Sequence, residues 1–155
     1  MMKSILKTAE IAEQKIHELL EGKFDLPEAY VYSIKTKSSN ELEVVKRHAN
    51  SDVYDLLSDE YTLGVTKNSE YIAVLTSGWA SPLTTSDDDD NDVPPSQHPM
   101  RRRVRLVVVA SRKGVASVLR FSDTPDETVT DNGKAKGSLA DAIYELFDKS
   151  EAQSN

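Results

Sequence analysis

Apolar residues recur along the chain with two different spacings, and these predict where helices and strands lie. Near the N-terminus the spacing alternates between four and three, which is typical of one face of an amphipathic helix. Glu10, Glu13 and Glu18 fall on its other faces. The apolar positions are Ile5, Ala9, Ala12, Ile16 and Leu19.

Two further stripes have helical spacing, and each follows a capping pattern in which an acidic residue stands three positions after a serine. The first begins at Ser38 and predicts a helix over about residues 40–58, in which a break near Asn50-Ser51 would let Ser51 or Asp52 start a new turn. The second begins at Ser138 and predicts a last helix near the C-terminus. The final residues, 150–155, are expected to fray.

Alternating apolar and polar residues predict the strands. A short strand is expected at 30–34, followed by one hairpin that pairs 61–66 with 71–75. A second hairpin pairs 104–110 with 115–121. The polar segment from 122 to 137 is expected to be a loop. The predicted core joins Val104, Leu106 and Val108 to Leu119, Phe121 and Leu75.

The order of these elements predicts a single α+β domain over residues 1–155. Consecutive hairpins give an antiparallel sheet of four to five strands, and we expect the helices to pack on one face of it. A chain of 155 residues is close to the usual size of one domain.

Composition limits the classes of partner. The chain has 19 basic and 26 acidic side chains, a net charge of −7, which argues against broad binding to nucleic acid or anionic lipid. The absence of cysteine excludes disulfides, thiolate metal sites and a cysteine nucleophile. No apolar run is long enough for a signal peptide or a membrane span, so we expect a cytoplasmic protein.

The polar, Pro-rich connector between the two hairpins, about residues 81–101, is the most unusual segment. It carries five aspartates between Asp87 and Asp92, and three consecutive arginines begin at its C-terminal end. Connectors of this length inside a domain are commonly functional or disordered. Contiguous aspartates repel one another and lack the alternating ligands of a calcium loop. We therefore expect a mobile charged loop without a tight metal site.

The candidate binding residues flank or lie in this connector. Guanidinium groups bind carboxylates and phosphates in a bidentate manner, so the arginines at the start of the next strand are the strongest candidates. They could instead pair with the aspartates or keep an exposed sheet face soluble. The tryptophan before the connector could anchor it or line a binding surface. The candidates are Trp79, His98, Arg101, Arg102, Arg103 and Arg105.

No catalytic or metal-binding signature accompanies these residues. His17, His48 and His98 have no ligand spacing, and the usual hydrolase and zinc motifs are absent. The loop before Ser138 contains glycines and lysines but lacks the order of a phosphate loop. We therefore predict no metal and no cofactor, and the sequence disfavours an enzyme.

Three segments carry a resemblance to known sequences. They are Gly78-Trp79-Ala80-Ser81-Pro82, the run from Pro94 to Val104, and Gly137-Ser138-Leu139-Ala140-Asp141-Ala142. In these segments the chain resembles small uncharacterised proteins of actinobacteria and their phages, over roughly its C-terminal half. The resemblance implies no activity and assigns no catalytic residue.

These observations favour a non-catalytic interaction or accessory protein, of phage or mobile-element type. Its expected partner is another protein or an anionic ligand, bound through the charged connector and the basic strand. One alternative is a hydrolase-type enzyme or ligand-binding domain for an anionic substrate, and a pocket joining His98 to two aspartates would favour it. The other is an acidic inhibitor or mimic that acts on a nucleic-acid-binding protein, which a continuous stripe of carboxylates would favour.

Overall fold

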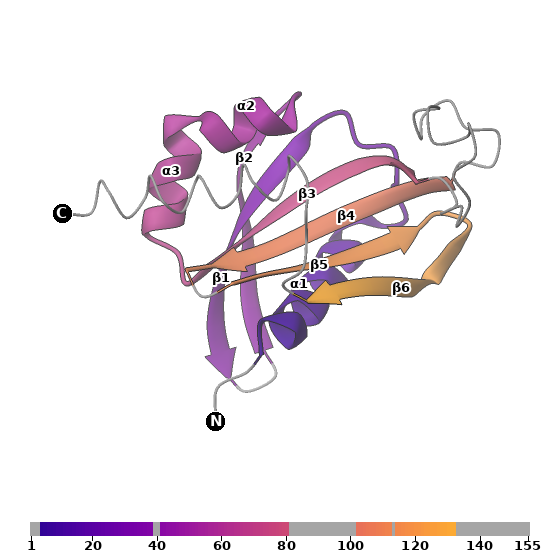
Figure 1. Ribbon diagram of the computed structural model, residues 1–155, viewed down its shortest axis with the longest axis horizontal. Coiled ribbons are helices and arrows are strands. Elements are labelled where there is room, and N and C mark those ends of the chain that lie inside the picture. Colours follow the sequence, from indigo (N-terminus) through magenta and orange to yellow (C-terminus); the bar gives the residue numbers. More distant parts are fainter. Residues whose placement is uncertain (1–3, 39–40, 81–101, 113, 133–155) are drawn as a thin grey trace, which may run out of the picture.

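The computed structural model describes residues 4–38, 41–80, 102–112 and 114–132. In these residues the chain forms three helices and six strands (Figure 1). None of the described helices has the length and apolar character needed to cross a bilayer. The elements are α1 (Ile5–Leu20), β1 (Ala29–Ser38), β2 (Glu41–Asn50), α2 (Val53–Ser58), α3 (Glu60–Lys67), β3 (Tyr71–Ala80), β4 (Arg102–Ser111), β5 (Gly114–Phe121) and β6 (Thr124–Asn132).

The six strands form one antiparallel sheet in the order β2-β1-β3-β4-β5-β6. The β1–β2 hairpin joins the rest of the sheet through the pairing of β1 with β3, in which Tyr30 lies opposite Leu75. Strands β4, β5 and β6 then follow as a meander, and Arg105 lies directly opposite Arg120 within it. The described sheet therefore has two edge strands, β2 and β6.

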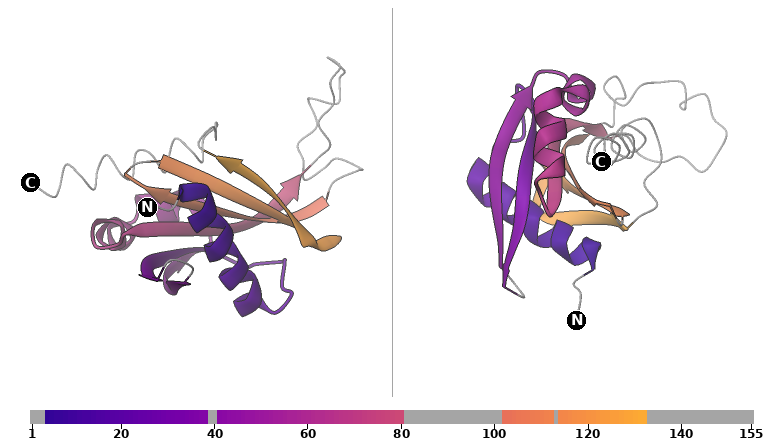
Figure 2. Two further views of the ribbon diagram at one scale, coloured as in Figure 1. Left: turned by 90° about the horizontal axis from the view of Figure 1, so that it is seen from below. Right: turned by 90° about the vertical axis from the view of Figure 1, so that its left-hand side faces the viewer.

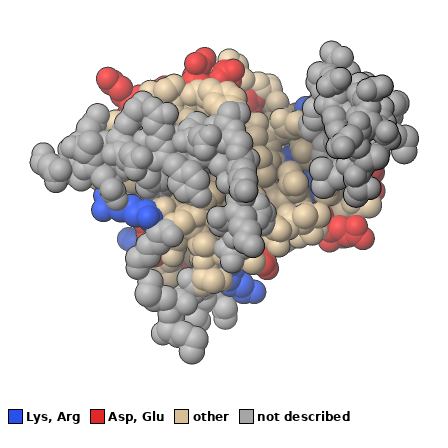
Figure 3. Space-filling model, in the orientation of Figure 1, with Lys and Arg blue, Asp and Glu red and all other residues tan. Residues whose placement is uncertain are grey.

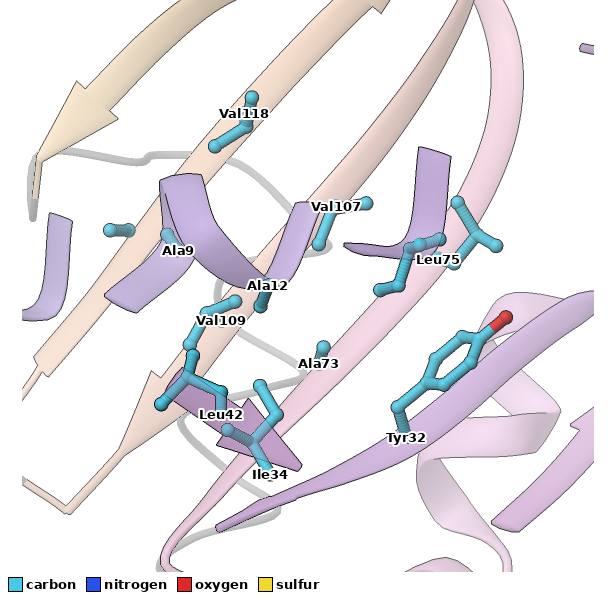
Figure 4. Close-up of a cluster of buried hydrophobic side chains, with 12 residues drawn as sticks. Ala9, Ala12, Tyr32, Ile34, Leu42, Ala73, Leu75, Val107, Val109 and Val118 are labelled. Atoms are coloured by element: carbon cyan, nitrogen blue, oxygen red, sulfur yellow. The ribbon is translucent and has the colours of Figure 1, made fainter. Parts of the chain in front are cut away.

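Helices cover both faces of the sheet (Figure 2). On one face, Ala9 and Ala12 of α1 are fully buried, and their small side chains let the helix backbone lie close to β4. Figure 4 shows Ala12 facing Val107 and Val109. On the other face, Leu56 and Leu57 of α2 pack against a second buried cluster. That cluster includes Ala29, Val31, Ile72, Val74, Val108, Ala110 and Val115.

The α+β class, the antiparallel sheet and the 104–110/115–121 hairpin are confirmed. The predicted helix over 40–58 is wrong: residues 41–50 form β2, and only Val53–Ser58 are helical. In β2, Val44 pairs with Ile34 and packs against the α1 cluster. Hairpin pairing with β1 and packing against α1 override the helical spacing of this segment.

The predicted strand at 61–66 is also wrong, because these residues belong to α3. Asp59 caps this helix by accepting a hydrogen bond from the Tyr61 backbone N–H at 2.7 Å. Thr62 and Thr66, one helical turn apart, are buried against the sheet. The strand expected at 71–75 is present as β3, but it pairs with β1 and β4 instead of with 61–66.

Three further expectations about the architecture need correction. The sheet has six strands because residues 124–132, expected to be a loop, pair with β5 as β6. The helices pack on both faces instead of one. Leu19 is 65% exposed, and its neighbour Leu20 packs against the core in its place.

The predicted core is correct in part. Val104 and Val108 are buried, Leu106 is half-buried, and Leu75 lies on the opposite face with Val107. The connector, the predicted helix at Ser138 and the tail lie outside the described residues.

Candidate functional site

The structure places three of the six predicted binding residues at the start of β4. These are Arg102, Arg103 and Arg105. Trp79 lies in β3, where its backbone is opposite Arg103. His98 and Arg101 lie outside the described residues, so the proposed grouping of His98 with the arginines stays a prediction.

Arg102 points to the β5–β6 turn. Its Nε lies 3.1 and 2.9 Å from the two carboxylate oxygens of Asp123, and its guanidinium stacks on the Phe121 ring at 4.0 Å. The hydrogen bond from Arg102 lowers the pKa of the Asp123 carboxyl. Both groups are exposed to solvent, so the pair orients Arg102 but contributes little to stability.

Arg103 and Arg105 lie on the α1 face of the sheet. The Arg103 Nε lies 2.7 Å from the Asp25 carboxylate. Arg105 is only 1% exposed, so it is not part of an accessible basic surface, and that part of the prediction is wrong. Its guanidinium donates to the Lys23 carbonyl at 2.8 Å and to Nδ1 of His17, and it stacks on Phe24 at 4.1 Å.

Arg120, opposite Arg105 on β5, makes a buried ion pair with Glu13 of α1. Its Nε and NH2 donate to the two Glu13 carboxylate oxygens at 2.7 and 2.6 Å. The same guanidinium also reaches the Gln14 side chain at 3.1 Å. Glu13, predicted to lie on a polar face of the helix, is buried. Glu13 adjoins buried Ala12 and Ile16 on the helix surface, and Arg120 beneath α1 supplies the charged partner for its carboxylate.

Buried Glu13, Arg105 and Arg120, together with half-buried His17, form a polar cluster that fastens α1 to β4 and β5. Burial, and then the positive charges of Arg120 and Arg105, lower the pKa of His17. An arginine can only donate, so Nδ1 of His17 accepts and the ring is neutral with its proton on Nε2. Every arginine in this cluster has protein acceptors, which is typical of a structural role and not of an open ligand site.

A different site, which the sequence analysis missed, lies on the opposite face of the sheet. A groove of about 790 Å³ runs between α3 and the β1–β2 hairpin. We call it the α3 groove. Its lining residues are Ser33, Ile34, Lys35, Glu43, Arg47, Glu60, Tyr61, Gly64, Val65, Asn68, Ser69 and Glu70. The sequence did not predict this groove, because residues 61–66 were assigned to a strand, whereas the helix that they form provides one wall of the groove.

Hydrogen bonds at both ends of α3 hold the groove open. At the N-terminal end, Nε2 of His48 lies 2.9 Å from the Asp59 carboxylate, and the His48 ring contacts the Tyr61 ring at 4.9 Å between centroids. The hydrogen bond with His48 lowers the pKa of Asp59. At the other end, Glu70 accepts from the backbone N–H and the hydroxyl of Thr36 at 2.9 and 2.8 Å. The two walls are therefore fixed relative to each other.

Two cationic groups that line the groove form no ion pair with an acidic side chain in the described part of the chain. Arg47 is exposed, and its Nε donates to the Ser33 hydroxyl at 2.8 Å. Lys35 is exposed and lies opposite Glu43 in the strand register, but Glu43 pairs with Lys37 at 3.3 Å. The lining of the groove therefore holds these two cationic groups beside three carboxylates, those of Glu43, Glu60 and Glu70.

The helical wall of the groove has a glycine at its centre. A Cβ added at Gly64 would meet no atom within 4 Å, and its φ lies outside the left-handed region. Neither internal packing nor backbone conformation therefore requires glycine here, although glycine destabilises a helix by about 1 kcal/mol relative to alanine. Tyr61, one turn earlier, is 56% exposed.

The described residues show no group of three or more His, Asp or Glu side chains that could hold a metal. Of the atoms coloured by charge in Figure 3, the acidic side chains lie in separate groups and do not form a continuous stripe on that face. Comparison of the chain with models of protein families, with curated proteins and with solved structures gave no match.

Proposed function

We propose that this protein is a non-catalytic interaction protein and that it binds a segment of another protein in the α3 groove. The observation that carries the proposal is a preformed groove whose lining includes cationic hydrogen-bond donors and an exposed tyrosine. The donors belong to Lys35 and Arg47, and the tyrosine is Tyr61. Tyrosine and arginine are enriched among residues that dominate binding energy at protein interfaces.

The shape of the groove supports a macromolecular ligand. A solvent-accessible groove of about 790 Å³ has room for a segment of another chain. Since both walls are already held by Asp59, His48, Glu70 and Thr36, binding requires little ordering of the protein itself.

The groups around the groove are suited to binding more than to catalysis. The His48–Asp59 pair is the nearest approach to an acid–base dyad, but Asp59 is also the cap of α3 and the His48 ring is stacked beside Tyr61. No hydroxyl is hydrogen-bonded to His48 in the described residues, so this pair has no adjacent nucleophile to activate.

The surface proposed here differs from the one expected from the sequence. At the start of β4, Arg102 and Arg103 are engaged by Asp123 and Asp25, whereas Arg47 and Lys35 form no ion pair within the described chain. The participation of His98, Arg101 and the charged connector stays a prediction, because these residues lie outside the described ranges.

The test compares two variants of the groove with two matched controls in capture from a lysate of the source organism. Gly64→Leu fills the groove, and Gly64→Ala restores helix propensity while adding only a methyl group. Arg47→Glu reverses a charge in the groove. Lys46→Glu makes the same charge change on the next residue, whose side chain lies over Tyr30.

We expect partners captured by the wild type to be lost in Gly64→Leu and Arg47→Glu and kept in both controls. All four variants should fold, because the altered side chains are exposed or face open space. If the groove variants capture the same proteins as the wild type, the α3 groove is not the binding surface.

A further inference from the structure

We infer that residues 138–149, which lie outside the described ranges, dock as a helix on the α2 face of the sheet over β4 and β5. This interaction does not involve the α3 groove and is independent of the proposed function. Three observations support it: an apolar patch that the described helices leave uncovered, a deeply buried valine within that patch, and the spacing of apolar residues in the segment.

The apolar patch lies on β4, β5 and β6. Leu106, Leu119 and Val129 are opposite one another in the strand register and form a row across the three strands, and Val104 and Phe121 form the next row. We call these five residues the β4–β6 patch. Leu106 packs against the buried cluster beneath α2, whereas the other four belong to neither cluster of described residues. On this face α2 and α3 pack chiefly on β1, β2 and β3 (Figure 1), so the patch has no described helix of its own.

Val104 is buried more deeply than its described neighbours explain. It is 5% exposed, yet Gly78 beside it on β3 has no side chain, and Phe121 on β5 is itself half-buried. Arg102, the next residue on that face of β4, is drawn towards Phe121 and Asp123. A valine among such neighbours is exposed on an open sheet, so a further layer of chain over the patch accounts for its burial.

The segment 138–149 has the sequence pattern of such a layer. Ser138 and Asp141 form a capping box, and the apolar residues that follow recur at the spacing of one helix face. A helix of about 12 residues is roughly 18 Å long and is only marginally stable in water by itself, so it needs an apolar surface to pack against. The apolar residues are Leu139, Ala142, Ile143, Leu146 and Phe147.

The end of β6 lies within reach of the patch. Asn132, the last residue of β6, is opposite Ala116 near the start of β5. Residues 133–137 can extend roughly 17 Å, whereas β4 lies about 10 Å from β6 across the sheet. The other face of β4 and β5 is already covered by α1. A short linker also gives a tethered segment a millimolar effective concentration, which favours it over a second copy of the chain.

The experiment measures the reactivity of single thiols in the full chain, which has no cysteine of its own. Leu119→Cys places a thiol in the patch, and Val118→Cys places one under α1 on the opposite face. Each is combined with Leu146→Asp, on the apolar side of the segment, or with Tyr144→Asp, on the other side of the same predicted helix. Modification by a water-soluble maleimide is followed by mass spectrometry.

We expect Leu146→Asp to raise the rate at Leu119→Cys at least tenfold and Tyr144→Asp to leave that rate unchanged. Val118→Cys should stay protected in both backgrounds. Equal rates at Leu119→Cys in the two backgrounds would overturn the inference, because the segment would not be what covers the patch.

Two other occupants give different results. If Leu83→Asp/Val93→Asp in the connector exposes Leu119→Cys and Leu146→Asp does not, the connector covers the patch and the inference is wrong. Protection that disappears on dilution of the otherwise unaltered chain would assign the patch to a second copy, with the same consequence.

A further measurement applies if Leu146→Asp also exposes Val118→Cys, which would indicate loss of the whole fold. Leu119→Cys is then combined with Ile143→Cys or with Leu146→Cys, and the protein is oxidised at low concentration. An intramolecular disulfide in either pair supports docking, and its absence in both overturns the inference.

Discussion

The ion pair between Glu13 and Arg120 offers the sharpest test of how α1 is held on the sheet. The side chains of Glu13 and Arg120 are 3% and 5% exposed, and two charge-assisted hydrogen bonds of 2.7 and 2.6 Å join them. Replacing Glu13 with leucine leaves the Arg120 guanidinium buried without a carboxylate. It also leaves that guanidinium facing Arg105 across the strand pair.

Breaking a buried ion pair by removing one partner typically costs 3–5 kcal/mol of folding free energy. We expect Glu13→Leu to lie in the upper part of this range, because the remaining cluster contains two cations and no anion. The double variant Glu13→Leu/Arg120→Leu should recover most of the loss, since an apolar pair of similar size avoids the desolvation of both charges. The recovery measures the coupling of the two residues.

The assay is urea unfolding followed by circular dichroism for the wild type, both single variants and the double variant. If Glu13→Leu does not fold, Glu13→Gln keeps the shape and one acceptor, and about 1.5–3 kcal/mol is expected for the weakened charged hydrogen bonds. A loss below about 1 kcal/mol for Glu13→Leu, or a double variant whose loss equals the sum of the singles, would refute the reasoning.

Two further predictions concern the α1 face of the sheet, where His17 and Leu75 lie, and the opposite face, where Leu106 lies. The pKa of His17 is lowered from 6.5 by burial and by Arg120 and Arg105, so the unfolded chain binds the proton more readily. Stability should therefore rise with pH up to about 6.5 and then level off, and His17→Gln should show a shallower rise in urea melts at pH 5 and 7.5. Leu75→Ala, at a fully buried site, should cost 2–5 kcal/mol, whereas Leu106→Ala, at a half-buried site, should cost clearly less in the same melts. Equal losses would contradict the assignment of the two faces.

Local pattern was sufficient where a segment's spacing and its final environment agree. The helix from Ile5, the strand after Leu26-Pro27, and the hairpin that turns near Arg112 were all predicted from spacing and turn residues alone. In each case the spacing of the apolar residues matches the element that forms, so it reports the secondary structure directly.

The same rule failed in β2 and in α3 because pairing, capping and burial decided between two acceptable local structures. The apolar residues of 41–50 fit a helix nearly as well as a strand, and pairing of Val44 with Ile34 selected the strand. The alternation in 61–66 fits a strand, but the Asp59 cap and the burial of Thr62 and Thr66 selected the helix. The pairing of β2 with β1 and the burial of Thr62 and Thr66 become visible only once these elements are placed in the fold.

For the candidate site, too, the sequence predicted some features and the fold decided others. The sequence by itself determined an acidic α+β chain with an antiparallel sheet and an arginine-rich strand. Net charge follows from composition, and helices and strands follow from the local spacing of apolar residues. Only the tertiary structure decided which charges are used internally. Arg105 and Arg120 are buried because α1 crosses them with Glu13 and His17, whereas Arg47 lies exposed on β2 with only the Ser33 hydroxyl as its partner among the described residues. Burial and pairing depend on residues far apart in the chain, so the fold, and not the local sequence, assigned each arginine its role.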